Sequence, residues 1–364
     1  MRNPTVSSVL LAVMATACMS DENFEEDVRE SNVAHREWHR EADVTNAEAY
    51  REVLAELRDL ERGTFTSDRD EGDWQIDIAY AIARPKTAVD RGSIIILNGR
   101  SETYEQYGEL IYDLRRQGYT LYLLDHRGQG RSDRMINFDR VGDSHYQKGT
   151  VDDFGEYSVD VRKFLMTVVQ PDRAGRSTPL YGLGHSMGAT VLTLFASLHP
   201  DVFDKLALSS PMFALDVDRS LGFKVMLALH PHDYANGGPW SPGNFANNAL
   251  TGSRGRFTAK QEVFAEKREL RVGGPTFDWV DSALDAMVRV RERNGEIKPP
   301  VLLFSGGSDR VVETSGHRTV CRQINTAGGS CRLIRIPEAR HEPLFETDEI
   351  RSRVLDTLVD FFEH

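Results

Sequence analysis

The stretch Leu180–Leu198, LYGLGHSMGATVLTLFASL, joins an apolar run, a tight turn and a helix, and it decides the fold. Residues 180–185 are a short apolar run typical of a buried strand, and residues 189–198 have the composition of a helix. Between them, the glycines of GHSMG (184–188) allow a sharp turn that lifts the side chain of Ser186 above the strand. The pattern G-x-S-x-G alone is frequent by chance. Its place between a strand and a helix is what predicts a nucleophilic serine.

Further short apolar runs alternate with helical segments on both sides of this turn. The predicted strands are residues 76–83, 93–98, 120–125, 180–185, 206–210, 301–305 and 332–336, and the helices include 104–116 and 151–169. This alternation predicts an α/β protein with a doubly wound, mostly parallel sheet. The connection between Ser210 and Val301 is about ninety residues long, far beyond an ordinary loop, and predicts a helical cap inserted after the sixth strand.

A serine hydroxyl needs a base to become a good nucleophile, and that base needs a carboxylate that fixes its tautomer. After a turn of this kind, the chain is expected to supply first the acid and then the histidine. Asp309 follows the predicted strand 301–305, and His341 follows the predicted strand 332–336. Both therefore lie at the carboxyl ends of strands, as Ser186 does, and the sequence predicts that the three form a triad.

Other acids and histidines fit these roles less well. Glu313 is expected to start the next helix, and Glu338 to lie in a surface loop. His185 lies inside the tight turn, where it is expected to pack or to orient its neighbours, and His317 is expected on a helix. His126, in the loop DHRGQGRS (125–132), is expected to be structural.

Acyl transfer also needs hydrogen-bond donors for the oxyanion that develops on the substrate. The first predicted donor is the backbone N–H of Met187, directly after the nucleophile. The second is the backbone N–H of Arg100, in the loop NGRSE (98–102) that follows a predicted strand. The side chain of Arg100 either points to solvent or contacts the substrate.

The composition narrows the class of partner. The formal net charge of −12 disfavours nucleic acid, because an acidic surface repels phosphate backbones. The sequence has no C-x-x-C pair, and its paired histidines (His35 and His39) lack the spacing of a zinc protease motif. We therefore expect no metal and no organic cofactor.

The first twenty residues predict a signal peptide. Arg2 is basic, residues 6–17 are apolar but too short to span a bilayer comfortably, and Ala15-Thr16-Ala17 resembles a cleavage site. Cys18 follows these small residues as in a bacterial lipobox, which predicts a lipid on Cys18, although Ala15 stands where leucine is usual. The alternatives are an uncleaved N-terminal anchor and a mispredicted start of the chain. The expected location is the bacterial cell envelope, facing the periplasm, with an outer-membrane lipoprotein as one form.

The remaining chain divides into four parts. Residues 21–62 are expected to form an acidic, solvated tether ending in an amphipathic helix (47–60), and residues 63–210 the first part of the core. Residues 211–298 form the cap, and residues 299–364 complete the core. Apart from Cys18 the chain has two cysteines, Cys321 and Cys331, which form a disulfide in an oxidising compartment or otherwise remain free thiols.

These residues together resemble the α/β-hydrolase fold, and within it a known family. The run NGRSETYEQYGELIYDLRRQGYTLYLLDHRGQGRSDR (98–134) is similar to PldB-type bacterial lysophospholipases, relatives of the monoglyceride lipases in the hydrolase-4 (serine aminopeptidase S33) group. The segments GHSMGA, LTGSRGRF, RVGGPTFDWV and ARHEPLFE are similar to it as well. The resemblance runs from about Glu71 to the C-terminus. One departure is Asn98-Gly99, where monoglyceride lipases have His-Gly.

The resemblance implies Ser186, Asp309 and His341 as catalytic residues, with Met187 and Arg100 as oxyanion donors. It implies that the substrate is a lysophospholipid, which is cleaved to a fatty acid and a glycerophospho-alcohol. Monoacylglycerols, small esters and peptide amides are the alternatives, and a catalytically silent fold that binds a lipid or a partner is the alternative of another class. The basic cap residues either contact a phosphate headgroup, lie solvated at the surface or form internal salt bridges; they are Arg254, Arg256 and Arg271. The apolar cap residues either line an acyl channel or pack in the core; they are Phe213, Leu221, Phe223, Met226 and Leu227.

Overall fold

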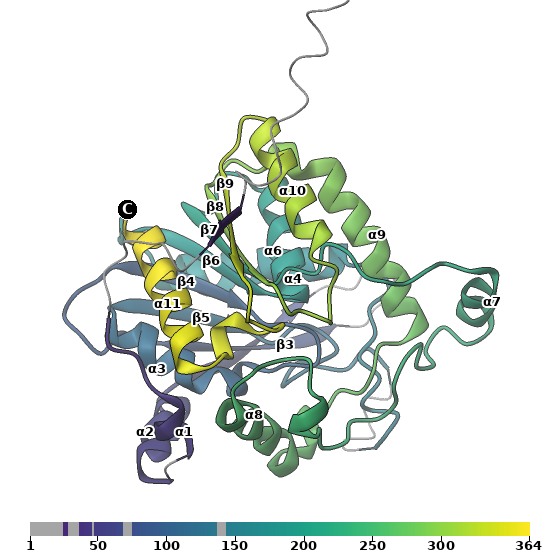
Figure 1. Ribbon diagram of the computed structural model, residues 1–364, viewed down its shortest axis with the longest axis horizontal. Helices are drawn as coiled ribbons and strands as arrows, with labels where there is room; N and C mark the ends of the chain where they lie inside the picture. Colours follow the sequence, from purple (N-terminus) through teal and green to yellow (C-terminus); the bar gives the residue numbers. More distant parts are fainter. Residues whose placement is uncertain (1–24, 28–35, 46, 68–74, 137–142) are drawn as a thin grey trace, which may run out of the picture.

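The computed structural model describes residues 25–27, 36–45, 47–67, 75–136 and 143–364. The strands of these residues form one nine-stranded sheet in the order β1-β9-β8-β7-β6-β4-β5-β3-β2 (Figure 1). Neighbouring strands are parallel except that β3 runs antiparallel to β2 and to β5. The strands are β1 (Glu25–Asp27), β2 (Glu61–Ser67), β3 (Ile76–Ala83), β4 (Gly92–Leu97), β5 (Tyr119–Leu124), β6 (Leu180–His185), β7 (Lys205–Ser209), β8 (Val301–Gly306) and β9 (Cys331–Ile336).

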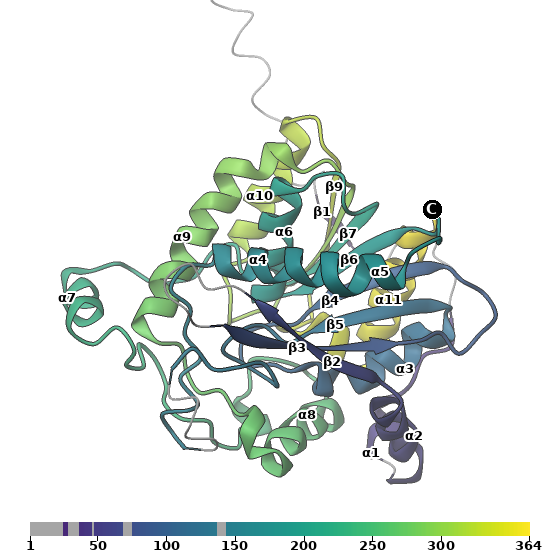
Figure 2. The ribbon, with the colours of Figure 1, turned by 180° about the vertical axis from the view of Figure 1, so that it is seen from behind.

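Helices cover both faces of the sheet (Figures 1 and 2). Helices α4, α6, α9 and α10 share one apolar core with the sheet, and α3 and α11 share another on the opposite face. The α-helices are α1 (Glu41–Thr45), α2 (Ala47–Arg58), α3 (Gly108–Arg116), α4 (Gly155–Phe164), α5 (Gln170–Asp172), α6 (Met187–Leu198), α7 (Leu221–Leu229), α8 (Arg254–Glu266), α9 (Phe277–Arg293), α10 (Ser315–Thr326) and α11 (Asp348–Glu363). Short helical turns are η3 (Tyr104–Tyr107), η4 (Leu165–Val169), η5 (Phe245–Asn247), η6 (Arg268–Leu270), η7 (Asn294–Glu296) and η8 (Pro343–Phe345).

The central strands are apolar because they have no solvent-facing side. β4, β5, β6 and β8 are buried along their whole lengths between the two helical layers. Parallel strands covered on both faces read as continuous apolar runs, which explains GSIIIL in β4 and YTLYLL in β5. The α/β-hydrolase fold and the seven predicted strands are thus confirmed, with strand ends within one residue of those predicted.

Two strands at the sheet edges were not predicted. β2 has the polar sequence ERGTFTS and pairs only with β3, so most of its side chains are exposed and it lacks an apolar run. β1 is three residues long and pairs with β9. The inserted cap follows β7, the seventh strand of the chain, at the position expected after Ser210, so the predicted count of six preceding strands is wrong.

Residues 36–45 pack against the core. Trp38 is 8% exposed, and its Nε1 donates to Oδ1 of Asp356 on α11 at 2.8 Å. The backbone N–H of His39 donates to Oδ1 of Asp113 on α3 at 3.0 Å. The prediction of a solvated tether is therefore wrong for residues 36–45, because a tryptophan and backbone hydrogen bonds attach this segment to both helices. The predicted signal peptide and Cys18 lie outside the described residues.

The inserted cap has two parts. α7 projects from the body of the molecule, whereas α8 lies beside the edge of the core (Figures 1 and 2). α9, which was predicted as part of the cap (211–298), instead packs against α6 in the helical layer of the core. Among the described residues, no helix is both long enough and apolar enough to cross a membrane.

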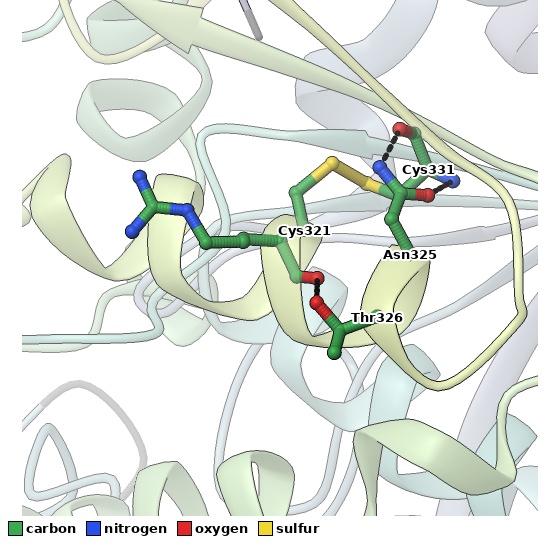
Figure 3. The surroundings of a disulfide bond; sticks show 5 residues. Cys321, Asn325, Thr326 and Cys331 are labelled. Carbon is green, nitrogen blue, oxygen red and sulfur yellow. Dashed lines mark hydrogen bonds between the residues drawn. A yellow bond between two sulfur atoms is a disulfide. The ribbon is translucent and has the colours of Figure 1, made fainter. Parts of the chain in front are cut away.

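A disulfide joins Cys321 on α10 to Cys331 at the start of β9 (Figure 3). Their Cα atoms are 5.3 Å apart, and ten positions separate them in sequence. Asn325 supports the same junction: its Nδ2 donates to the Cys331 carbonyl at 2.9 Å, and its Oδ1 accepts from the Cys331 N–H at 2.7 Å. Of the two alternatives left open by the sequence, the structure has the disulfide.

Candidate active site

The turn between β6 and α6 holds Ser186 in a strained backbone conformation. Its φ of 51° lies in the left-handed region, which residues other than glycine rarely adopt. A Cβ atom at Gly188 would lie 2.3 Å from the Leu97 carbonyl oxygen, and one at Gly184 would lie 2.5 Å from the Cα of Ala189. The two glycines are therefore required by close packing, and the turn has the geometry of a nucleophile elbow.

The structure brings the three predicted triad residues together. His341 Nε2 lies 3.0 Å from Ser186 Oγ, and His341 Nδ1 lies 2.8 Å from Asp309 Oδ2. Ser186 follows β6, Asp309 follows β8 and His341 follows β9, so the meeting point is the carboxyl edge of the sheet. The competing residue His317 is bound elsewhere, between Ser305 and the Pro211 carbonyl.

Asp309 is held as a carboxylate. Burial alone would raise its pKa, but the hydrogen bond and the charge of His341 and the amides of Val311 and Val312 together hold the pKa of Asp309 below its usual value. The two amides donate to Asp309 Oδ1 at 2.8 and 3.2 Å, which leaves Oδ2 for the imidazole. An ionised carboxylate can only accept, so the proton of His341 lies on Nδ1 and the lone pair of Nε2 faces the serine.

The two predicted oxyanion donors lie near the nucleophile, because Met187 directly follows Ser186 and Arg100 lines the same cavity as Ser186. Met187 is the first residue of α6, so its N–H is one of the unsatisfied donors at a helix N-terminus. Arg100 lies in the loop after β4, and this loop is held from both ends. The Gln129 side chain donates to the Gly99 carbonyl at 2.8 Å and accepts from the Ser101 N–H at 3.2 Å.

Asn98 takes the place of the histidine found in monoglyceride lipases. Its Nδ2 donates to Asp125 Oδ1 at 2.9 Å, so it ties the oxyanion loop to the end of β5. Asp125 is buried and also accepts hydrogen bonds from Thr103 and from the amides of Tyr104 and Arg131. The substitution therefore keeps the loop in place.

The side chain of Arg100 joins the oxyanion loop to the cap. Its guanidinium lies 4.7 Å from the centre of the Trp279 ring and donates to the carbonyls of Gly273 and Gly274 at 2.8 and 2.9 Å. Burial lowers the pKa of Arg100 to about 10, which still leaves it charged at neutral pH. The side chain is thus occupied by backbone carbonyls and does not point to solvent.

A cavity of about 290 Å³ opens beside Ser186 and His341. Its apolar lining comes mainly from the cap segments, which supply Trp240, Leu250, Phe257 and Phe264, with Val311 from the loop after β8. Its polar lining includes Glu102, Lys260 and Glu342. Apolar walls with a few placed polar groups are the usual form of a small-molecule site, so this cavity is the candidate substrate site.

Three buried charges in this lining were not singled out from the sequence. Lys260 Nζ lies 2.7 Å from Glu102 Oε1 and 2.8 Å from Glu342 Oε2. Among the described residues, Glu102, His185 and Glu342 are the one group whose ligand atoms lie close enough together to hold a metal ion. Because the ammonium of Lys260 already lies between the two carboxylates, this cluster does not fit a metal. In the sequence, the one feature that could have drawn attention to this cluster is that Glu342 directly follows the predicted catalytic residue His341.

The basic cap residues do not line this cavity. Arg256 is 2% exposed, and it binds Glu109 with two nitrogens and Asp348 at 2.7 Å. Of the alternatives left open for Arg256, the structure has internal salt bridges rather than a contact with a headgroup site. Arg254 is exposed, and its guanidinium lies over the Phe245 ring. Arg271 donates to the carbonyls of Phe264 and Ala265 and stacks on Trp240, so it supports the cavity wall from behind.

The apolar cap residues considered above as the lining of an acyl channel do not line this cavity either. Phe213 is fully buried in the core, and Phe223 packs against Phe277. Leu221 is 79% exposed on α7, and Leu227 borders a separate acidic cavity. Helical spacing identified apolar positions, but it did not show which element would face the nucleophile.

The fold, the elbow and the hydrogen-bonded Ser–His–Asp triad define a serine hydrolase of the α/β-hydrolase fold. The chain belongs to the serine aminopeptidase S33 (hydrolase-4) family, which matches residues 88–348. The lysophospholipase L2 of Escherichia coli K12 is 37% identical over 313 residues, which is 82% of this chain and 88% of that protein. A probable lysophospholipase L2 of Haemophilus influenzae is 29% identical over 80% of this chain and 90% of that protein.

Solved structures agree on the fold. A soluble variant of the monoglyceride lipase of Saccharomyces cerevisiae superimposes with a TM-score of 0.61 and 17% identity, over 82% of this chain and 96% of that one. A carboxyl esterase of Bacillus coagulans gives 0.60 and 16%, over 83% and 99%. These structures confirm the fold, whereas the family predicted from the residues is confirmed by the family match and by the relative at 37% identity.

Proposed function

We propose that this serine ester hydrolase is a lysophospholipase that releases the fatty acid of a single-chain phospholipid. The observation that carries the proposal is the triad beside a cavity in which aromatic and aliphatic cap side chains face buried polar groups. The names of the relatives in E. coli and H. influenzae support the same substrate class.

The geometry supports the following acylation step. Ser186 Oγ attacks the ester carbonyl while its proton passes to His341 Nε2, 3.0 Å away. The N–H groups of Met187 and Arg100 stabilise the oxyanion that forms, and Asp309 stabilises the imidazolium. The bond between the carbonyl carbon and the glycerol oxygen then breaks. The leaving oxygen takes the proton from His341, which leaves an acyl group on Ser186.

Deacylation repeats these roles with water. His341 removes a proton from a water molecule, whose oxygen attacks the acyl carbonyl, and the same donors stabilise the second oxyanion. Collapse breaks the bond to Ser186 Oγ, which takes the proton back from His341. The product is the free fatty acid.

Monoacylglycerol is the second candidate substrate. It is favoured by the observation that the cations in the cavity lining are already bound by protein groups. The cations that line the cavity are Arg100 and Lys260, and both are engaged by protein groups, Arg100 by carbonyls and Lys260 by two carboxylates. A neutral glycerol headgroup needs no free cation, whereas a phosphate gains from one.

The test is fatty-acid release by the purified protein and by Ser186→Ala on lysophosphatidylethanolamine, monoacylglycerol and a short nitrophenyl ester. Ser186-dependent release that is fastest on the lysophospholipid supports the proposal. Preference for monoacylglycerol moves the assignment to the second candidate. A folded protein that releases nothing and resists a fluorophosphonate is a binding protein instead.

We also propose that the protein is exported and held at a membrane surface through a lipid on Cys18. The support is the signal-like N-terminus and the disulfide between Cys321 and Cys331, since disulfides persist mainly in oxidising compartments. Cells grown with labelled palmitate are expected to label the wild-type protein but not Cys18→Ser. Recovery of unprocessed wild-type protein in the cytoplasm contradicts export.

A further inference from the structure

A buried ionic cluster links the cap to both catalytic loops. Lys260 comes from the cap helix α8, Glu102 from the oxyanion loop after β4, and Glu342 directly follows His341. The three side chains are 9, 8 and 4% exposed. Here one cap side chain contacts both loops that carry the chemistry.

Glu102 transmits the contact to the oxyanion loop. While its Oε1 binds Lys260, its Oε2 accepts from the Gly99 N–H at 2.6 Å and from the Tyr107 hydroxyl at 2.7 Å. Gly99 directly precedes Arg100, whose N–H is the second oxyanion donor. The orientation of the Gly99 peptide therefore depends on a carboxylate that Lys260 holds in place.

Glu342 transmits the contact to the base. Its side chain binds Lys260, and its N–H donates to the Leu250 carbonyl of the cap at 2.8 Å. The N–H of the preceding residue, His341, lies 3.4 Å from the Ala249 carbonyl. The loop of His341 is therefore seated on the cap through both its backbone and the carboxylate of Glu342.

The cluster is a costly way to stabilise a fold. Burying one ammonium and two carboxylates removes all three from water, and ion pairs of this kind add little net stability compared with apolar packing. Burial and the neighbouring carboxylate of Glu102 raise the pKa of Glu342, against the opposing effect of Lys260. What buried ionic groups do well is to fix relative positions, because a displaced partner is left unpaired.

We propose that Lys260 is a positioning residue for ester hydrolysis: from the cap, it holds the oxyanion loop and the histidine loop in register with Ser186. The inference rests on the proposed function, because it concerns the rate of the Ser186 reaction. It makes the cap part of the catalytic apparatus as well as the wall of the substrate cavity.

The first test compares Lys260→Met with Lys267→Met. Lys267 is a matched control, since it lies at the end of the same helix and pairs with Glu105, but its side chain is 37% exposed and makes no contact with Glu102 or Glu342. Because small misplacements of catalytic groups reduce rates by about 100-fold, Lys260→Met is expected to lower kcat about 10- to 100-fold. KM should stay within about twofold of wild type, and the loss should be equal on a lysophospholipid and on nitrophenyl acetate. Lys267→Met is expected to match wild type.

The outcomes separate the proposal from simpler roles. Lys260→Arg keeps a cation that can bridge two carboxylates, so it is expected to recover most of the kcat lost in Lys260→Met. A folded Lys260→Met with wild-type kcat, or with a change confined to KM or to the melting temperature, overturns the inference. An equal loss in the Met and Arg variants also overturns it, because packing rather than charge is then responsible.

Two further controls keep the test decisive. If Lys260→Met does not fold, Glu342→Gln provides the measurement, since it keeps an acceptor for Lys260 but removes the charge beside His341. It is expected to lower kcat at least threefold, and an unchanged kcat refutes the inference. If wild type itself shows no Ser186-dependent hydrolysis, the proposed function fails instead.

Discussion

Reducing the bond between Cys321 and Cys331 is expected to lower stability without lowering activity. The bond closes the part of the chain that lies between two triad residues: α10 follows Asp309, and β9 precedes His341. Neither cysteine lines the cavity. The hydrogen bonds of Asn325 to the backbone of Cys331 hold the same junction after the bond is broken, so the native structure should persist (Figure 3).

The magnitude follows from the length of the closed loop. A crosslink between residues ten positions apart removes chain entropy from the unfolded state, worth about 3 kcal/mol at 25 °C. For a chain of 364 residues the unfolding entropy near the midpoint is about 0.8 kcal/mol per kelvin, so reduction should lower the melting temperature by about 4 °C.

The assay is urea unfolding with and without a phosphine reductant, followed by both tryptophan fluorescence and circular dichroism. The two signals must coincide before a free energy of unfolding is extracted. Cys321→Ala/Cys331→Ala is the control, and reductant should not change its stability. Equal stability of the oxidised and reduced protein, or loss of esterase activity on reduction at 25 °C, refutes the reasoning.

Three further predictions follow from the site and its surroundings. Asp309→Asn is expected to lower kcat about 10⁴-fold with an unchanged melting temperature, because the amide no longer fixes the tautomer of His341; a loss under tenfold contradicts the triad. Arg256→Met is expected to destabilise the protein by about 3–5 kcal/mol, because it removes the bidentate partner of the buried carboxylate of Glu109. The ratio of the rates on lysophospholipid and monoacylglycerol should stay constant. Calorimetry measures the first effect, and the two activity assays measure the second. Burial lowers the pKa of His317 to about 4, below its value in the unfolded chain. As the pH falls, the unfolded chain therefore binds a proton before the folded protein does. The stability that His317 contributes is complete above pH 6.5 and falls by about 3 kcal/mol as the pH drops towards 4. A urea midpoint that does not decrease when the pH is lowered from 7 to 5 contradicts the prediction for His317.

The parts of the molecule that could be predicted are those in which one local signal determines the outcome. A parallel strand buried on both faces must be apolar, so the central strands were visible as apolar runs. The triad could be predicted because each residue follows a strand whose carboxyl end lies at the same edge. β2 escaped prediction because a largely exposed edge strand such as ERGTFTS carries no such run.

The contacts of the cap could not be predicted for a physical reason. A buried arginine or lysine needs a negatively charged partner. The sequence does not show whether that partner is a carboxylate of the protein or a phosphate of a ligand. Arg256 binds Glu109, 147 positions away, and Lys260 binds Glu102, 158 positions away. Pairings at such separations depend on how the cap is seated, which no local pattern specifies.

The two parts of the cap relate to the core in different ways. The segment around α8 is tied to it by buried charges: Arg256 to Glu109, and Lys260 to Glu102 and Glu342. Moving this segment away would leave several charges buried and unpaired at once, and removing one partner of such a pair alone costs about 3–5 kcal/mol. α7 carries no comparable buried ion pair among the described residues, and it projects from the body of the molecule (Figure 2). Its residues Leu221 and Leu229 are exposed to solvent. The fixed part of the cap therefore completes the catalytic site and shapes the cavity through Phe257 and Phe264, so differences in acyl preference should be sought at these two aromatic positions rather than at the cap arginines.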